Sequence, residues 1–259
     1  MLTDQAFTRY QRQIALPEFG EEGQQRLSNS HVLVIGCGGL GSAASLYLTA
    51  AGIGHMVLVD DDCVESSNLQ RQVAYRHCDI GKQKVDAIAG QLVALNPDVR
   101  LRTLNHRLDE RQLELEVMLA DVVLDCTDNI ATRQMINRVC FEQKTVLISA
   151  AAIGWQGQFA VFDYVNGTAC YRCLYPFDEL KNGQSCSQMG VIGPIVGTLG
   201  NYQAIAAIQK LALEKFSVAT GQLHLFDGKT LLWQSISITQ DMQCLVCSSK
   251  ESAYLGEGQ

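Results

Sequence analysis

Short apolar runs alternate with longer amphipathic stretches along residues 31–152. The apolar runs, whose length and content of Val, Ile and Leu are typical of buried strands, lie at 31–36, 55–60, 98–104, 121–126 and 145–151. The helical patterns between them cover residues 41–52, 82–95, 109–118 and 129–142. Because strands that alternate with helices pair in parallel, this pattern predicts a doubly wound, Rossmann-like α/β sheet.

The pattern differs on both sides of this region. Further helices are expected at 3–12, 18–28 and 194–216, the last of them long and mostly buried. Antiparallel strands are expected at 158–164, 222–226 and 231–238. The last two strands flank Asp227-Gly228, which is a strong hairpin signal. With no repeat or linker along residues 1–259, we expect one domain, in which antiparallel strands extend a mostly parallel sheet.

Composition narrows the class of protein without identifying it. A hydrophobic content of 47% with 18% charged residues is typical of a globular protein. Apolar runs such as 32–35 and 146–153 are too short to cross a bilayer, and residues 1–30 lack a signal-peptide core. We therefore expect a cytoplasmic protein with no membrane partner. The net charge of −7 argues against binding to nucleic acid.

A glycine loop gives the first indication of chemistry. Gly36-Cys37-Gly38-Gly39-Leu40-Gly41 follows a predicted strand and opens a predicted helix, as in dinucleotide-binding units. Such glycines let backbone amides approach a phosphate at the helix N-terminus. Asp60 ends the second strand, the position of the acidic residue that binds a ribose. NAD(P)-dependent oxidoreductases share these features, so the glycine loop and Asp60 do not exclude that class of enzyme.

Asp60 is followed by an unusual density of polar residues. Asp61 and Asp62 come next, and the run Asn68-Leu69-Gln70-Arg71-Gln72 lies shortly after them. Lys82 and Lys84 begin the following helix, where they belong either to a solvated face or to a phosphate site. This cluster suits a nucleotide that reacts at its phosphates, since Arg12, Arg71 and these lysines could make a pocket locally positive.

The segment Asp125–Asn129 lies at the end of the fourth predicted strand. Ligands of open parallel sheets bind outside the carboxyl ends of the strands. Asp128 is therefore a candidate ligand for Mg²⁺, and Asn129 could position the nucleotide. The alternative is a helix N-cap, a position that favours both Asp and Asn.

Ten cysteines in a chain expected to be cytosolic do not indicate disulfides. Two Cys-x-x-Cys pairs, Cys170/Cys173 and Cys244/Cys247, match the four-thiolate pattern of structural zinc. The alternative is a redox-active or merely packed pair. Cys186 lies apart in the polar stretch 165–190, either as an accessible nucleophile or as a bystander.

Taken together, these motifs resemble the ThiF/MoeB/HesA family, bacterial relatives of the ubiquitin-activating enzymes. The resemblance extends from about residue 7 to Cys247. It is carried by Arg9–Gln13, Gly36–Gly41, Asp60–Val64, Ser67–Gln72, Gly81–Lys84, Asp125–Asn129 and Cys170–Cys173. The segments Asp128–Gln134 and Leu225–Trp233 are more similar to the family members that serve thiamine biosynthesis than to those that serve molybdopterin synthesis.

The resemblance implies an adenylyltransferase that uses ATP and Mg²⁺. Its partner would be a ubiquitin-fold sulfur carrier of the ThiS kind, whose C-terminal Gly-Gly carboxylate becomes an acyl-adenylate. The implied nucleotide site consists of Gly39, Gly41, Asp60, Asp62, Ser67, Asn68, Leu69, Gln70, Arg71, Gln72, Lys84, Asp128 and Asn129. Within it, Asp60 holds the ribose, Asn68, Arg71 and Lys84 bind phosphates, and Asp128 coordinates Mg²⁺. Arg12 would come from the second subunit of a homodimer.

The resemblance also assigns the cysteines. Cys170, Cys173, Cys244 and Cys247 would bind Zn²⁺, and Cys186 would form an acyl-disulfide during sulfur transfer. Sulfur would come from a separate donor such as a cysteine desulfurase. The implied organisation is N-terminal helices over 1–30, a nucleotide-binding half over 31–152, a carrier-binding and zinc half over 153–247, and a flexible tail over 248–259.

Three alternatives remain at this point. The first is an adenylyltransferase of the MoeB kind that acts on the small subunit of molybdopterin synthase. The second, an NAD(P)-dependent oxidoreductase, leaves Arg71, Lys84 and Asp128 without a role. The third is a zinc-containing scaffold that binds a ubiquitin-fold partner without catalysis, and the same residues argue against it.

Overall fold

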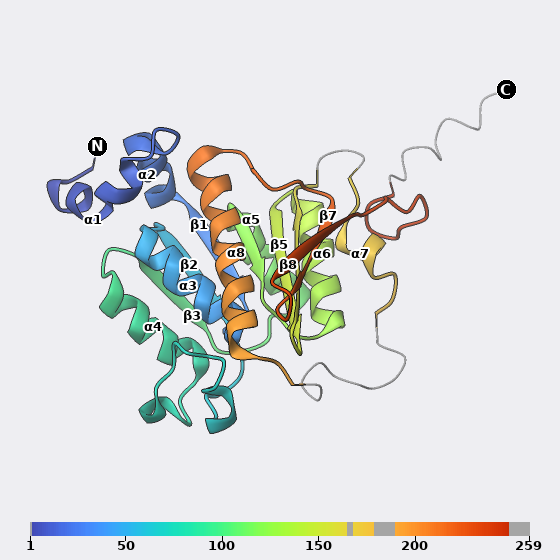
Figure 1. Ribbon diagram of the computed structural model, residues 1–259, viewed down its shortest axis with the longest axis horizontal. Coiled ribbons are helices and arrows are strands. Elements are labelled where there is room, and N and C mark those ends of the chain that lie inside the picture. Colours follow the sequence, from blue (N-terminus) through green and yellow to red (C-terminus); the bar gives the residue numbers. More distant parts are fainter. Residues whose placement is uncertain (1, 165–167, 179–189, 249–259) are drawn as a thin grey trace.

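A mixed sheet of eight strands forms the centre of the molecule (Figure 1). The computed structural model describes residues 2–164, 168–178 and 190–248. In spatial order the strands are β3 (Arg100–Leu104), β2 (His55–Val59), β1 (His31–Ile35), β4 (Val122–Asp125), β5 (Val146–Ile153), β6 (Gln156–Phe162), β7 (Gln222–Asp227) and β8 (Leu232–Ser237). The first five pair in parallel and the last three add antiparallel pairs. The predicted Rossmann-like sheet with its antiparallel extension is confirmed.

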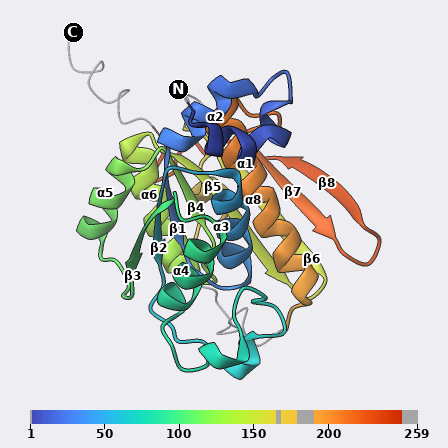
Figure 2. The ribbon, with the colours of Figure 1, turned by 90° about the vertical axis from the view of Figure 1, so that its left-hand side faces the viewer.

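Helices cover both faces of the parallel part (Figure 2). Their bounds are α1 (Asp4–Ile14), α2 (Gly20–Asn29), α3 (Gly39–Ala51), α4 (Lys84–Leu95), α5 (Glu110–Leu119), α6 (Ile130–Gln143), α7 (Tyr171–Leu174) and α8 (Gly193–Leu213). Helices α3, α4 and α8 pack on one face, whereas α5 and α6 pack on the other. Two short 3₁₀ turns, η1 (Ser66–Asn68) and η2 (His77–Asp79), lie between β2 and α4.

The alternation of side chains along β1 explains its uninterrupted apolar sequence. Val32 and Val34 join the core beneath α3 and α8, while Leu33 and Ile35 join the core beneath α5 and α6. A parallel strand that is covered on both faces has no solvent side to favour polar residues. By contrast, most of the edge strand β8 is exposed.

The structure differs from the sequence prediction in two places, at the end of a helix and within a predicted loop. The long helix ends at Leu213 because Glu214 adopts the left-handed conformation at its C-cap, with φ of 58°. Part of the polar stretch after residue 164 forms the single-turn helix α7. Within the described residues, no helix has both the length and the apolarity needed to cross a bilayer.

Candidate functional site

The loops that follow β1, β2 and β4 meet at one edge of the sheet. The strand order changes direction between β1 and β4, which is where open α/β sheets bind ligands. Gly36 turns the chain at the end of β1 with φ of +92°, and a Cβ there would lie 2.7 Å from the carbonyl oxygen of Cys126. The glycine loop therefore contacts the segment that leads to Asp128.

Two further glycines let α3 begin directly at this loop. A Cβ on Gly41 would lie 1.9 Å from the carbonyl oxygen of Gly36, and one on Gly39 would lie 2.5 Å from Val196 Cγ2 of α8. The N-cap of α3 is Gly38, which supplies no side chain to bind the first helical amides. An uncapped helix N-terminus of this kind is suited to bind an anion.

Asp60 is held firmly beside the glycine loop. Its Oδ2 accepts a hydrogen bond from the Cys37 amide at 2.7 Å, and its Oδ1 accepts one from the Asp62 amide at 2.9 Å. Burial raises the pKa of Asp60, although Lys84 and both amides oppose that shift. Lys84, the first residue of α4, is itself buried and donates to Asp62 Oδ2 at 2.7 Å. The predicted ribose acid and phosphate lysine therefore share one wall of the site.

The segment Ser67–Gln72 forms a second wall. Asn68 is buried and its Oδ1 accepts from the Glu65 amide at 3.1 Å, so it shapes the turn η1. Arg71 donates to the Ser67 carbonyl at 3.0 Å. A Cβ on Gly38 would lie 3.6 Å from Gln72 Nε2.

Within the described residues, the buried Oε1 of Gln72 has no hydrogen-bond partner. A buried polar atom without a partner is costly. Next to the glycine loop it is available for a ligand.

Leu69 and Gln70 lie in the same segment but contact protein. Leu69 packs against the core beneath α3 and α8. A Cβ on Gly193 would lie 2.5 Å from the Gln70 carbonyl oxygen, so the backbone there abuts the start of α8. These two residues orient the second wall, and their contact with a nucleotide stays a prediction.

The segment that follows β4 carries two further candidate site residues, Asp128 and Asn129. Asn129 caps α6, since its Oδ1 accepts from the Thr132 amide at 2.9 Å. Asp128 is exposed, and its carboxylate makes no hydrogen bond or ion pair with the part of the chain that the structure describes. The helix-cap interpretation thus applies to Asn129, while Asp128 is available for a cation.

Arg12 lies far from these residues in its own chain. Its neighbour Gln13 donates to the Ala51 carbonyl at 2.8 Å, at the C-terminal end of α3, whereas the glycine loop lies at the start of that helix. A helix of 13 residues is roughly 20 Å long. Arg12 is exposed, and its own chain does not bring it to the site.

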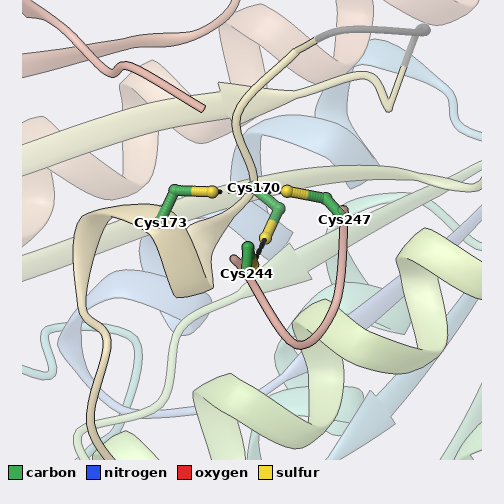
Figure 3. A group of neighbouring side chains, drawn as sticks. All are labelled: Cys170, Cys173, Cys244 and Cys247. Carbon is green, nitrogen blue, oxygen red and sulfur yellow. Dashed lines mark hydrogen bonds between the residues drawn. The ribbon is translucent and has the colours of Figure 1, made fainter. Parts of the chain in front are cut away.

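Four cysteines converge on the α5/α6 side of the sheet (Figure 3). The Sγ atoms of Cys170 and Cys244 are 3.7 Å apart, and those of Cys173 and Cys247 are 3.3 Å apart. These separations exclude disulfides, in which the sulfur atoms are about 2.0 Å apart. They approach the spacing of about 3.8 Å that tetrahedral coordination at Zn–S distances of about 2.3 Å requires.

Donors around the cluster also fit a metal site. The Val246 amide lies 3.5 Å from Cys244 Sγ and the Asp241 amide lies 3.4 Å from Cys173 Sγ, and both donate to sulfur. The Asn137 side chain donates to Cys170 Sγ at 3.6 Å. Such outer-shell donors typically orient metal-binding side chains. The cluster has the donor set of a closed, structural metal site.

Two residues that shape the candidate nucleotide site were not predicted from the sequence. Tyr75 donates to the Cys37 carbonyl at 2.6 Å and thereby fixes the glycine loop. Arg133 is buried behind Asp128 and forms an ion pair with Asp125. Only the position of Arg133 within the segment Asp128–Gln134 could have drawn attention to it. Cys186 lies outside the described residues, so its role stays a prediction.

This arrangement defines a Rossmann-like protein with a candidate nucleotide site at the switch point and a four-cysteine cluster. The ThiF family model matches residues 10–246, so the chain belongs to the ThiF family. It is 45% identical over 251 residues to the sulfur carrier protein ThiS adenylyltransferase of Escherichia coli K12, covering 97% of this chain and 99% of that protein. It is 41% identical over 247 residues to the molybdopterin-synthase adenylyltransferase of the same organism, covering 95% and 98%.

Solved structures support the fold. Escherichia coli MccB crystallised with ATP superposes with a TM-score of 0.80 at 23% identity, covering 92% of this chain and 74% of that one. PaaA superposes with a TM-score of 0.79 at 22% identity, covering 93% and 76%. The family predicted from the motifs is confirmed, and both curated relatives above are named as adenylyltransferases.

Proposed function

We propose that this protein is an ATP-dependent adenylyltransferase that activates the C-terminal Gly-Gly carboxylate of a ubiquitin-fold sulfur carrier of the ThiS kind. One observation carries the proposal. The uncapped N-terminus of α3, the pair formed by Asp62 and Lys84, and the unpartnered Asp128 meet at the carboxyl edge of the sheet. A hydride-transferring enzyme also uses such a helix N-terminus but has no evident use for Lys84 and Asp128, whereas a reaction at the phosphates does.

In the proposed reaction the carrier carboxylate attacks the α-phosphorus of ATP, and pyrophosphate leaves. In this adenylation step the protein forms no covalent bond to the substrates, so positioning and charge neutralisation supply most of the rate. Asp60 accepts hydrogen bonds from the ribose, while Arg71 and Lys84 neutralise the phosphates. Asp128 would hold a Mg²⁺ ion, which when bound would supply positive charge beside the phosphates. Gln72 offers its unpartnered Oε1 to the nucleotide or its bound water.

The proposal also specifies which carrier protein is the substrate. The slightly greater similarity to the ThiS enzyme favours a carrier for thiamine biosynthesis over the small subunit of molybdopterin synthase. A separate donor such as a cysteine desulfurase would transfer a persulfide sulfur to Cys186. The outer sulfur would then displace AMP from the acyl-adenylate to form an acyl-disulfide with the carrier, which an external thiol would reduce to the carrier thiocarboxylate. The reaction would take place in the cytoplasm, where thiols stay reduced.

A homodimer would complete the site. Tyr47 of α3 and Tyr202 and Ile205 of α8 are exposed apolar side chains on adjacent helices (Figure 1). A two-fold axis across this layer would pair the helices of two subunits antiparallel. The C-terminal end of α3, against which α1 and its Arg12 pack, would then lie over the glycine loop of the partner.

Pyrophosphate exchange tests the carrier and the site together. We expect labelled pyrophosphate to enter ATP when the ThiS-like carrier is present, and to do so much more slowly with the molybdopterin synthase small subunit. Asp128→Ala should abolish exchange without unfolding the protein, whereas Asp98→Ala, at an exposed position away from the site, should not change it. Exchange with the molybdopterin carrier alone would contradict the thiamine assignment.

Mixed dimers test whether Arg12 acts across the subunit interface. Arg12→Ala and Asp128→Ala chains should each be inactive alone. When they are mixed at random, half of the dimers contain one of each, and one of the two sites in such a dimer has both residues intact. Exchange should therefore recover to about a quarter of the wild-type rate. If Arg12 acts within its own chain, the mixture will stay inactive.

Metal analysis tests the four-cysteine site. We propose that it holds one structural Zn²⁺, which joins the segment 244–247 to α7. Cys247→Ser should lose zinc and unfold at a lower temperature, because three thiolates leave the tetrahedral shell incomplete. Cys63→Ser, at an exposed cysteine outside the cluster, should keep both zinc content and melting temperature. Wild-type protein purified without zinc at full stability would refute a structural metal.

A further inference from the structure

Arg133 lies buried beneath the segment that carries Asp128. Its guanidinium lies 3.4 Å from Asp125 Oδ2 and donates to Ser149 Oγ at 3.1 Å. It also donates to the carbonyl oxygens of Thr127 and, at 2.8 Å, of Ala150. The arginine thus contacts both the end of β4 and the neighbouring strand β5. Its contact with Thr127 is one residue away from Asp128.

Asp125 holds the same segment from the other side. Its Oδ1 accepts from the Thr127 amide at 3.0 Å and from the Thr127 hydroxyl at 2.7 Å. Its Oδ2 accepts from Ser149 Oγ at 2.9 Å. Thr127 is therefore fixed at its amide, its hydroxyl and its carbonyl by a single buried ion pair. The conformation at residue 127 in turn sets the direction in which Asp128 leaves the sheet.

The network continues toward the four-cysteine cluster. Arg133 and Tyr171, the residue that follows Cys170, line the same small cavity, and Tyr171 favours the charged form of the guanidinium. The Tyr171 amide donates to Asn137 Oδ1 at 2.9 Å, and the Asn137 side chain donates to Cys170 Sγ at 3.6 Å. Arg133 and Asn137 lie one turn apart on α6. One face of this helix therefore contacts both the Asp128 segment and the Cys170 turn.

We propose that Arg133 is a positioning residue, which fixes the carboxylate of Asp128 for the cation of the nucleotide. Tyr171 connects Arg133 to the turn that carries Cys170 of the four-cysteine cluster. The inference rests on the proposed function, which gives Asp128 its role. Its physical basis is the cost of an unpaired charge in the interior. Removal of the guanidinium would leave Asp125 buried without its counterion, and the hydrogen bonds at Thr127 would then rearrange.

The test compares Arg133→Lys and Tyr171→Phe with Arg138→Lys. Lysine keeps the charge at 133 but loses the fork of donors that reaches Ser149 and two carbonyls at once. Arg138 is a matched control because it lies on the same helix, where it pairs with the exposed Glu110 at 2.8 Å. The first measurement is hydrogen–deuterium exchange of the segment 125–130 in nucleotide-free protein. The second is the Mg²⁺ concentration that half-saturates pyrophosphate exchange at saturating ATP and carrier.

We expect Arg133→Lys to accelerate deuterium uptake in 125–130 and to raise the half-saturating Mg²⁺ concentration by roughly tenfold, the lower end of the effect seen when groups that orient a metal ligand are lost. Tyr171→Phe should raise it by about threefold, because the guanidinium loses the polar phenol oxygen beside it. The KM for the carrier should not change. If Arg133→Lys does not fold, Ser149→Ala replaces it, with the same expected direction.

Wild-type deuterium uptake and Mg²⁺ dependence in the folded variants would overturn the inference, as would a lower melting temperature with no other change. If the proposed function is wrong, pyrophosphate exchange will give a different result. In that case the wild-type protein would show no exchange with either carrier. Deuterium uptake of the Asp128 segment would still report whether Arg133 holds it.

Discussion

The close approach of backbone to backbone at the end of β1 is the constraint on which the nucleotide site depends. Gly36 and Gly41 leave room for the Cys126 carbonyl and for the first turn of α3. A methyl group at Gly41 would overlap a carbonyl oxygen, so the helix would have to move away from the strand. If α3 moved, its N-terminus would no longer face the segment that carries Asp128, and Asp60 would lose its bond to the Cys37 amide.

Buried charge and hydrogen bonding make this edge of the sheet rigid. The Asp60 carboxylate, the Lys84 ammonium and the pair formed by Asp125 and Arg133 are all partly or fully removed from water, and each has a specific partner. Asp128 differs because its carboxylate projects from this rigid frame without a partner among the described residues. A positioned but unneutralised carboxylate is suited to a reaction whose main demand is the balance of phosphate charge.

The parallel pairing and most element bounds could be predicted because both follow from the local pattern of strands and helices along the chain. β1 to β5 are short apolar runs buried on both faces, and their alternation with helices fixed the parallel pairing. The switch-point rule then placed Asp60 and Asp128 at the same edge. The end of α8 was less predictable, since Phe216 prolongs the apolar pattern beyond Leu213 and the left-handed Glu214 stops the helix before it.

Contacts between distant side chains could not be predicted in the same way. Nothing in the sequence near Arg133 shows that it meets Asp125 and Tyr171, and nothing near Tyr75 shows that it binds the glycine loop. The distance of Arg12 from its own glycine loop depends on the packing of α1 against the end of α3. The four cysteines were the exception, because paired spacing carries its own geometric meaning and the two pairs do converge.

We propose that the sulfur carrier itself receives the AMP group. The most direct measurement is the intact mass of a ThiS-like carrier quenched after brief incubation with this protein, ATP and Mg²⁺. We expect the carrier to be heavier by one adenylyl group, located at its C-terminal glycine, and one pyrophosphate to be released for each adenylyl group formed. An unmodified carrier in the presence of ATP consumption, or an adenylyl group on any other residue, would contradict it.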